Sequence, residues 1–309
     1  MNKIIKKKVL LMGKGGAGKT SMRTILFSNY LPAQTQQLTV TIGVDHSQIS
    51  FLGNYTLNLW DCGGQKLFMD AFLNTQKSSN FKSVEALIYV FDVTSETFDK
   101  DIQEYRAVLE KLYEYSPNAK LFSLVHKMDA FADDEKDYHY LQMEGKIKLV
   151  SKPFHVVCFG TSIYDDTLYF AWSSITYSLI PMINEVETKL NQFCNFIEAD
   201  EIVVYEASSL LVMSYSSRVE FSESRRFENV STSIKSFDHS CAELKKTKFK
   251  NFQVCLPDKK IYFDSFTSST YIMVIFSNKA LTFANVALNV NAVRDEFENL
   301  IGFKGDDDC

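Results

Sequence analysis

The chain has 309 residues, of which 46% are hydrophobic and 23% are charged, with only 12 glycines and 5 prolines. This composition excludes a disordered or fibrous protein, and the length indicates two domains. Because 33 basic residues stand against 38 acidic ones, for a net charge of −5, no nucleic-acid-binding surface is expected. The longest apolar runs, at 86–91 and 271–276, are too short for direct membrane insertion. The six cysteines form no CxxC pair, so we expect reduced thiols in an intracellular protein.

The first half of the chain alternates predicted strands and helices. A buried strand at 8–12 precedes a glycine-rich turn and a helix at 19–29. The segments 46–52 and 56–60, joined by Gly53-Asn54, predict a β-hairpin. Further strands are predicted at 86–91, 121–125 and 154–159, and further helices at 99–115, between 125 and 154, and at 168–179, before Pro181. This order predicts an α/β domain with a mostly parallel sheet and helices on both faces.

The second half has a different order of elements. After Pro181, apolar residues recur every three or four positions and predict an amphipathic helix, whose apolar face would cover either its own sheet or a partner. The members of this stripe are Ile183, Val186, Leu190, Phe193 and Ile197. Strands are predicted at 202–205, 210–215, 249–255, 261–266 and 271–276, with helices at 225–246 and 281–300. We therefore expect an α+β domain with a five-stranded antiparallel sheet at residues 182–309, after a first domain at 1–181. His239 and Cys241 are close in sequence, and a core pair is favoured over a catalytic dyad there.

Residues 13–20, GKGGAGKT, match the pattern GxxxxGK[ST] between a predicted strand and a predicted helix. In such a loop, backbone N–H groups and the helix N-terminus surround a phosphate, Lys19 neutralises β- and γ-phosphate oxygens, and Thr20 ligates Mg²⁺. The alternative is a flexible glycine-rich turn. The residues that we assign to the nucleotide are Gly15, Gly16, Ala17, Gly18, Lys19, Thr20 and Ser21.

The segment 61–65 follows the predicted hairpin strand and supplies candidates for γ-phosphate chemistry. Asp61 would hold the magnesium ion through water, Gly64 would present its N–H to the γ-phosphate, and Gln65 would orient the attacking water. Alone, the pattern is an ordinary turn. In the polar segment 31–45, Thr41 and then Thr35 are candidates to reach Mg²⁺ and the γ-phosphate, the alternative being ordinary loop threonines.

The segment 126–129, His-Lys-Met-Asp, follows the strand at 121–125 and resembles the guanine-reading NKxD motif. The Asp129 carboxylate would accept hydrogen bonds from the guanine N1 and N2 donors, and adenine offers no matching pair. His126 replaces the common asparagine, and taken alone this departure leaves the choice of base open. Ser162 and Ile163, after the strand at 154–159, resemble the loop that backs the guanine. His126, Lys127, Asp129, Ser162 and Ile163 complete the predicted nucleotide site.

Together these segments resemble a Rag-family small GTPase of the RagA/RagB type. The similarity is carried by residues 6–20, 51–54, 57–65, 87–93, 124–129, 161–163 and 171–175. A histidine in the first position of the base-reading motif belongs to the family pattern. The catalytic half fits closely, and the last hundred or so residues fit loosely. Gly160 and Lys66 depart from the pattern and bear on regulator and partner contacts.

The resemblance implies a guanine-nucleotide switch with slow intrinsic GTP hydrolysis and a roadblock-type C-terminal domain. It implies a heterodimer with a RagC/RagD-like subunit, a cytoplasmic protein recruited by a scaffold complex to the lysosomal or vacuolar surface, and amino-acid signalling to the target-of-rapamycin complex. No arginine is marked by its spacing as a finger in cis, so a GTPase-activating partner is expected to supply that charge. Two rival functions are a P-loop ATPase or small-molecule kinase and a GTP-bound structural module without turnover.

Overall fold

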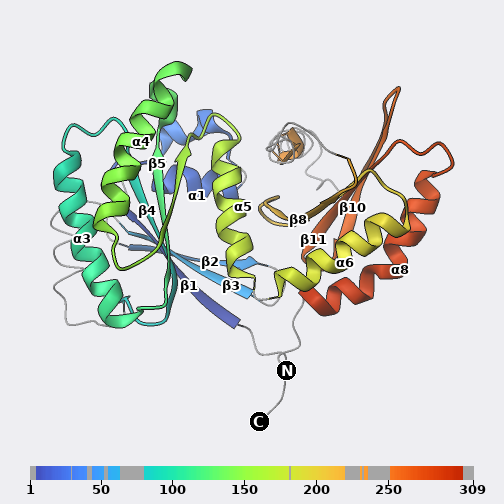
Figure 1. The fold of residues 1–309 in the computed structure, drawn as a ribbon, viewed down its shortest axis with the longest axis horizontal. Helices are drawn as coiled ribbons and strands as arrows, with labels where there is room; N and C mark the ends of the chain where they lie inside the picture. Colours follow the sequence, from blue (N-terminus) through green and yellow to red (C-terminus); the bar gives the residue numbers. More distant parts are fainter. Residues whose placement is uncertain are drawn as a thin grey trace, which may run out of the picture. The chain divides into compact units, whose positions relative to one another are not determined.

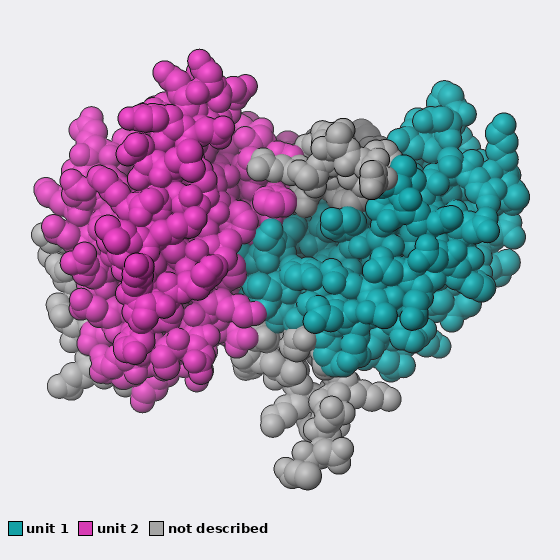
Figure 2. All heavy atoms as spheres, viewed as in Figure 1, with its two compact units in different colours: residues 1–5, 50–55, 172–309 teal, residues 6–49, 56–171 magenta. Residues whose placement is uncertain are grey.

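The computed structural model describes residues 5–28, 30–39, 44–51, 55–62, 80–180, 182–219, 230–231, 233–235 and 251–301. The chain divides into two compact units, coloured in Figure 2. Unit 2 comprises residues 6–49 and 56–171, and unit 1 comprises residues 1–5, 50–55 and 172–309. This division falls inside a helix, α5 (Thr167–Leu179), so the predicted domain boundary after residue 181 stays a prediction.

A six-stranded sheet is built from the first half of the chain (Figure 1). Its order is β2-β3-β1-β4-β5-β6, and β1, β4, β5 and β6 pair in parallel. Only residues 52–54 separate β2 from β3, a connection too short for a parallel crossover. The strands are β1 (Ile5–Gly13), β2 (Val44–Phe51), β3 (Tyr55–Cys62), β4 (Val84–Asp92), β5 (Lys120–His126) and β6 (Val156–Thr161).

Helices lie on both sides of this sheet (Figure 1). On one face, α3 (Phe98–Tyr115) and α4 (Asp133–Val150) bury Tyr105, Leu112 and Ile147 against alternate residues of the central strands. The Tyr89 and Tyr105 rings meet there with centroids 4.8 Å apart. The helix α1 (Lys19–Phe27) lies on the other side. The predicted α/β architecture is therefore confirmed.

The second sheet is antiparallel, in the order β8-β7-β11-β10-β9. Its strands are β7 (Glu201–Glu206), β8 (Val212–Ser217), β9 (Phe252–Cys255), β10 (Lys260–Thr267) and β11 (Thr270–Phe276). The helices α6 (Ile183–Phe196) and α8 (Phe283–Ile301) pack on it and on each other. This arrangement confirms the predicted five-stranded α+β module.

The helix α6 resolves the ambiguity of the apolar stripe after Pro181. All five stripe residues are buried, and α6 packs mainly against β8. The stripe therefore covers its own sheet and is not available to a partner.

Several element boundaries differ from the sequence predictions. The strand β3 continues to Cys62, so Asp61 lies within a strand and not in the turn after it. The polar segment 31–45 contains a 3₁₀ helix, η1 (Pro32–Gln37), and β2 begins at Val44. Of the predicted helix 225–246, residues 230–231 and 233–235 are described and helical. His239, Cys241 and Lys66 lie outside the described residues.

None of the helices in the described part of the chain combines the length and the apolar composition that a membrane span requires.

Candidate functional site

The loop that follows β1 depends on conformations and close approaches that favour glycine. Gly13 has a φ of +139°, and a Cβ on it would lie 2.2 Å from the carbonyl oxygen of Val90 on β4. Gly16 and Gly18 have φ values of +82° and +93°, in a region that side chains disfavour. The loop leads directly into α1, whose first N–H groups have no partner within the helix. Loop and helix start thus form a cradle for an anion.

Lys19 brings a positive charge to this cradle. It is the first residue of α1, is only 5% exposed, and its Nζ donates to the carbonyl oxygens of Gly13 (2.8 Å) and Lys14 (3.0 Å). Thr20 and Ser21 follow it in the first turn of the helix. The loop and this turn therefore bring together the predicted phosphate-binding residues Gly15, Gly16, Ala17, Gly18, Lys19, Thr20 and Ser21.

Lys14 tethers the loop to α3, a contact absent from the sequence predictions. Its Nζ donates to Ser95 Oγ (3.2 Å) and Thr97 Oγ1 (2.7 Å) and lies 3.6 Å from Asp101 Oδ1. Asp101, in the first turn of α3, is 5% exposed and also accepts a hydrogen bond from Ser95 Oγ (2.6 Å). The only signal for this cluster in the sequence is a lysine at a variable position of the glycine-rich pattern.

His126 connects the base-reading segment to the phosphate-binding loop. It ends β5, is 2% exposed, and shares a 2.9 Å hydrogen bond between its Nδ1 and Thr161 Oγ1 at the end of β6. The other side of its ring faces Gly18, since a Cβ on Gly18 would lie 2.8 Å from His126 Nε2. A side chain at position 18 would therefore clash with the His126 ring.

The environment of His126 keeps its imidazole neutral. Burial lowers the pKa of His126 to about 4, and the negative charge of the nearby Asp129 only partly opposes this effect. An uncharged ring can accept one hydrogen bond and donate another. His126 therefore acts as a neutral spacer between two loops at neutral pH.

Lys127 holds the base-reading segment to the end of β4. It has a φ of +66°, and its Nζ forms a 2.6 Å ion pair with Asp92 Oδ2. Burial alone would raise the pKa of Asp92, but the hydrogen bonds from Lys127 and Thr94 outweigh burial and hold the pKa below its usual value. Lys127 thus fixes the position of the segment, in addition to its predicted place in the nucleotide site.

Asp129 meets the loop after β6. It lies in a short 3₁₀ helix, η3 (Met128–Ala130), is exposed, and its Oδ1 accepts a 2.6 Å hydrogen bond from Ser162 Oγ. Ser162 is fully buried, and its N–H donates to Thr167 Oγ1 (2.8 Å). Ile163 follows in the same loop and is half-buried. Within the described residues only one carboxylate oxygen of Asp129 is engaged, so the other can accept from a ligand.

Gly160, one of the two positions predicted to depart from the pattern of the family that the sequence resembles, lies under Tyr140 of α4. A Cβ at this position would lie 3.3 Å from Tyr140 Cδ2, so the tyrosine ring would have to shift slightly to make room for it. The Tyr140 hydroxyl donates to the carbonyl oxygen of Cys158 at 2.9 Å. The tyrosine therefore occupies the space that a larger residue at position 160 would fill.

The remaining predicted residues are Thr35, Thr41, Asp61, Gly64 and Gln65. Thr35 is buried in η1, where its hydroxyl donates to the carbonyl oxygen of Pro32 (2.7 Å), so its proposed reach to magnesium stays a prediction. For Asp61 the structure gives the backbone alone, near the end of β3 beside β1. Thr41, Gly64 and Gln65 lie outside the described residues. The hydroxyl of Thr20 and the carboxylate of Asp61 are oxygen ligands of the kind that Mg²⁺ prefers.

Comparison with known proteins decides the family. Residues 8–234 match the family model described as Gtr1/RagA G protein conserved region. The chain belongs to the Gtr1/RagA G protein family. This result confirms the resemblance predicted from the sequence and, with it, the small-GTPase fold of the first half.

The relatives of this Gtr1/RagA family member include Ras-related GTP-binding proteins named A, B and C. Ras-related GTP-binding protein A of Dictyostelium discoideum is 45% identical over 297 residues, which cover 96% of this chain and 98% of that protein. Ras-related GTP-binding protein B of Rattus norvegicus is 40% identical, with 100% and 90% covered. Ras-related GTP-binding protein C of Homo sapiens is 26% identical, with 68% and 53% covered. The chain is therefore more similar to the A and B proteins than to the C protein.

We predict that His126 makes the stability of this protein fall as the pH is lowered. Its pKa is about 4 in the folded chain and about 6.5 in an unfolded one, so between these values the unfolded chain binds more protons. Stability should therefore decrease from pH 6.5 to pH 4, by up to about 3 kcal/mol from this group. Urea denaturation at a series of pH values measures the effect.

The matched variants for this test are His126→Asn and His155→Asn. The first removes the buried imidazole and should flatten the decrease, whereas the second removes an exposed histidine and should not. An equal pH dependence in His126→Asn and in the unaltered chain would contradict the neutral, buried state of His126.

Proposed function

We propose that this Gtr1/RagA family member binds GTP and GDP in the cradle after β1 and acts as a switch that hydrolyses GTP. The observation that carries this proposal is the joining of two loops by His126. One loop has the glycine backbone and Lys19, which suit phosphates, and the other has Asp129 and Ser162, which suit a base. A phosphate-binding and a base-binding segment held by one side chain favour a nucleotide over an isolated anion.

The phosphate end would use charge and oxygen ligands. Lys19 would neutralise the β- and γ-phosphate oxygens while backbone N–H groups of the loop bind them. Thr20, Thr41 and, through water, Asp61 would hold Mg²⁺. A bound Mg²⁺ would draw charge from the phosphate oxygens and fix their position.

The base end favours guanine. An exposed carboxylate can accept hydrogen bonds from both the N1–H and the N2–H donors of guanine, and the Ser162 hydroxyl fixes its orientation. Adenine lacks this pair of donors, so binding it would leave the carboxylate without matching partners. This feature argues against the rival function of a P-loop ATPase or small-molecule kinase.

Hydrolysis would depend on Gln65, which we assign to orienting the attacking water. No arginine in the sequence is marked by its spacing as a finger in cis, so we expect slow intrinsic hydrolysis. An activating partner that inserts an arginine is typically worth about 10³–10⁵ in rate. The presence of Gln65 favours turnover over the second rival function, a GTP-bound module that never hydrolyses its nucleotide.

We further propose that the chain is one subunit of a heterodimer with a RagC/RagD-like subunit. The similarity to proteins of the C type supports the existence of such a related partner. The second half would be the roadblock-type dimerisation domain. Because the α6 stripe is buried against its own sheet, the partner would use another surface of unit 1.

The cellular role is part of this proposal and rests on the resemblance to the Rag family. We expect a cytoplasmic protein that a scaffold complex recruits to the lysosomal or vacuolar surface. There the heterodimer would signal the amino-acid supply to the target-of-rapamycin complex. Loss of the γ-phosphate would change which partners bind, as in other nucleotide switches.

Asp129→Asn tests the choice of base. The amide can accept only one of the two guanine donors and brings its own donor, which suits the C2 carbonyl oxygen of xanthine. Losing a charge-assisted pair of hydrogen bonds should weaken GTP binding about 100-fold and improve xanthosine triphosphate binding. Calorimetric titration with both nucleotides gives the two affinities. Asp133→Asn, which alters an exposed carboxylate at the start of α4, is the control. Unchanged selectivity in Asp129→Asn would contradict the proposed role.

Lys14→Met tests the tether between the phosphate-binding loop and α3. The change removes the cation that faces the buried Asp101 carboxylate and should loosen the loop. Because Lys14 is partly exposed, we expect an increase of about fivefold to tenfold in the nucleotide dissociation rate. Release of a fluorescent GTP analogue measures this rate. The control is Lys100→Met, which alters an exposed lysine in the first turn of α3, next to Asp101. A dissociation rate equal to that of the control would show that the tether has no role in nucleotide retention.

Truncation after residue 181 tests the role of the second half. The shortened chain should retain GTP binding and lose its complex with a co-expressed RagC/RagD-like subunit. Affinity purification followed by size-exclusion chromatography compares it with the full chain. A stable complex formed by the shortened chain would assign dimerisation to the first half instead.

A further inference from the structure

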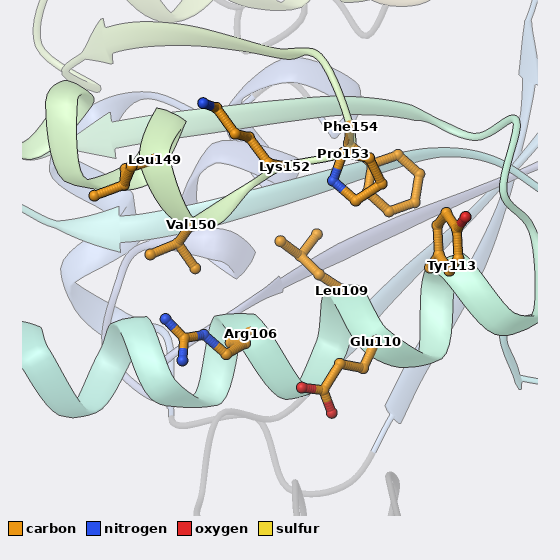
Figure 3. A pocket seen from close by; sticks show the side chains of 9 residues that line it. All are labelled: Arg106, Leu109, Glu110, Tyr113, Leu149, Val150, Lys152, Pro153 and Phe154. Atoms are coloured by element: carbon orange, nitrogen blue, oxygen red, sulfur yellow. The ribbon is translucent and has the colours of Figure 1, made fainter.

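A groove in unit 2 lies apart from the nucleotide site. It has a volume of about 380 Å³ and runs between the second half of α3 and the end of α4, closed by the segment that leads into β6 (Figure 3). Its lining residues are Arg106, Leu109, Glu110, Tyr113, Leu149, Val150, Lys152, Pro153 and Phe154.

The groove lies near the amino-terminal ends of the parallel strands, whereas the phosphate-binding loop lies at their carboxyl-terminal ends. Pro153 and Phe154 come just before β6 begins at Val156, whereas the loop follows the end of β1 at Gly13. The strands β1 and β6 run in the same direction through the parallel pairing of β1, β4, β5 and β6. An occupant of the groove would therefore not compete with the nucleotide.

Large apolar side chains are left in water along this groove. Leu149 is 70% exposed and Tyr113 is 56% exposed, above a floor formed by the buried Leu109. The Tyr113 and Phe154 rings meet edge to face with centroids 6.0 Å apart. Such a grouping of exposed apolar side chains in a concave site is typical of a binding surface.

The charges around the groove are asymmetric. In Figure 3, Arg106 and Lys152 lie on opposite rims at one end, with Val150 between them, and the rings of Tyr113 and Phe154 lie at the other end. Within the described residues neither cation forms an ion pair. By contrast, the lysines at positions 111, 146 and 148 on the same two helices pair with carboxylates. The side chain of Glu110 extends away from the apolar floor (Figure 3). With respect to the described residues, the groove thus offers two cations without an ion-pair partner next to an apolar surface.

We propose that this groove binds a peptide segment of a partner protein, in which a large apolar side chain is flanked by acidic residues. The apolar side chain would pack on Leu109, Tyr113 and Phe154, and the acidic residues would pair with Arg106 and Lys152. The proposal does not depend on nucleotide binding. However, α3 takes part in both sites, since its first turn holds Lys14 and its second half lines the groove.

The test uses the full chain and two phage-displayed peptide libraries. In both libraries the central residue is Leu, Phe or Trp, and it is flanked by Asp and Glu in one library and by Lys and Arg in the other. Selected peptides are synthesised with a fluorophore, and their affinities are measured by anisotropy. We expect only the acidic library to yield binders, and we expect their affinity to fall as salt is added.

Charge-reversal variants locate the binding site. The double variant Arg106→Glu/Lys152→Glu should weaken the selected peptides by about tenfold or more, and Leu149→Ala should weaken them without changing the salt dependence. Lys100→Glu, a single charge reversal on the exposed side of α3, should have no effect, and Arg106→Glu and Lys152→Glu alone are compared with it. Circular dichroism verifies that each variant is folded.

Four outcomes would overturn the proposal. These are selection of basic peptides, failure of both libraries, and peptide affinities that the double variant does not change. The fourth is a concentration-dependent self-association that the double variant abolishes, which would assign the groove to a second copy of the chain.

Discussion

The candidate site depends on the burial of one imidazole between three segments of the chain. His126 ends β5, bonds to Thr161 at the end of β6, and packs so closely on Gly18 that no Cβ fits there. Because burial holds its pKa at about 4, the ring adds no charge beside the cationic Lys19 of the phosphate cradle. A charged side chain in the same place would have to be paired or solvated, and at 2% exposure water does not reach this position. The neutral histidine therefore sets the separation of the phosphate-binding and base-reading loops.

The register of the parallel sheet explains why these residues meet. Asp92, His126 and Thr161 occupy neighbouring positions across β4, β5 and β6. Gly13 lies opposite Val90 at the same edge. Parallel strands end together, so the loops that follow them converge on one crevice. Short polar contacts then hold these loops to one another, including the ion pair of Lys127 with Asp92 and the hydrogen bond of Ser162 to Asp129.

Sequence predicts those features of the fold and of the candidate site that have a local pattern. The glycine-rich loop, the apolar central strands and the antiparallel order of the second half each have a signature within a short window. The ends of strands are harder to predict. The segment 61–65 has the pattern of an ordinary turn, yet Asp61 belongs to β3. The apolar stripe of α6 could cover either its own sheet or a partner. The sequence pattern is the same in both cases, and only the packing on β8 decides between them. Contacts between distant residues, such as Lys14 with Asp101 or Tyr140 over Gly160, leave no pattern in a single sequence.

Competition between nucleotides tests most directly whether one site binds both the phosphates and the guanine base. The full chain, purified with any partner that accompanies it, is loaded with a fluorescent GTP analogue, with Mg²⁺ and without it. GTP, GDP and ATP are then titrated against the bound analogue. We predict displacement by GTP and GDP at micromolar or lower concentrations, weaker binding without Mg²⁺, and no displacement by ATP. Equal displacement by ATP would contradict the base-reading role of Asp129 and the guanine switch built on it.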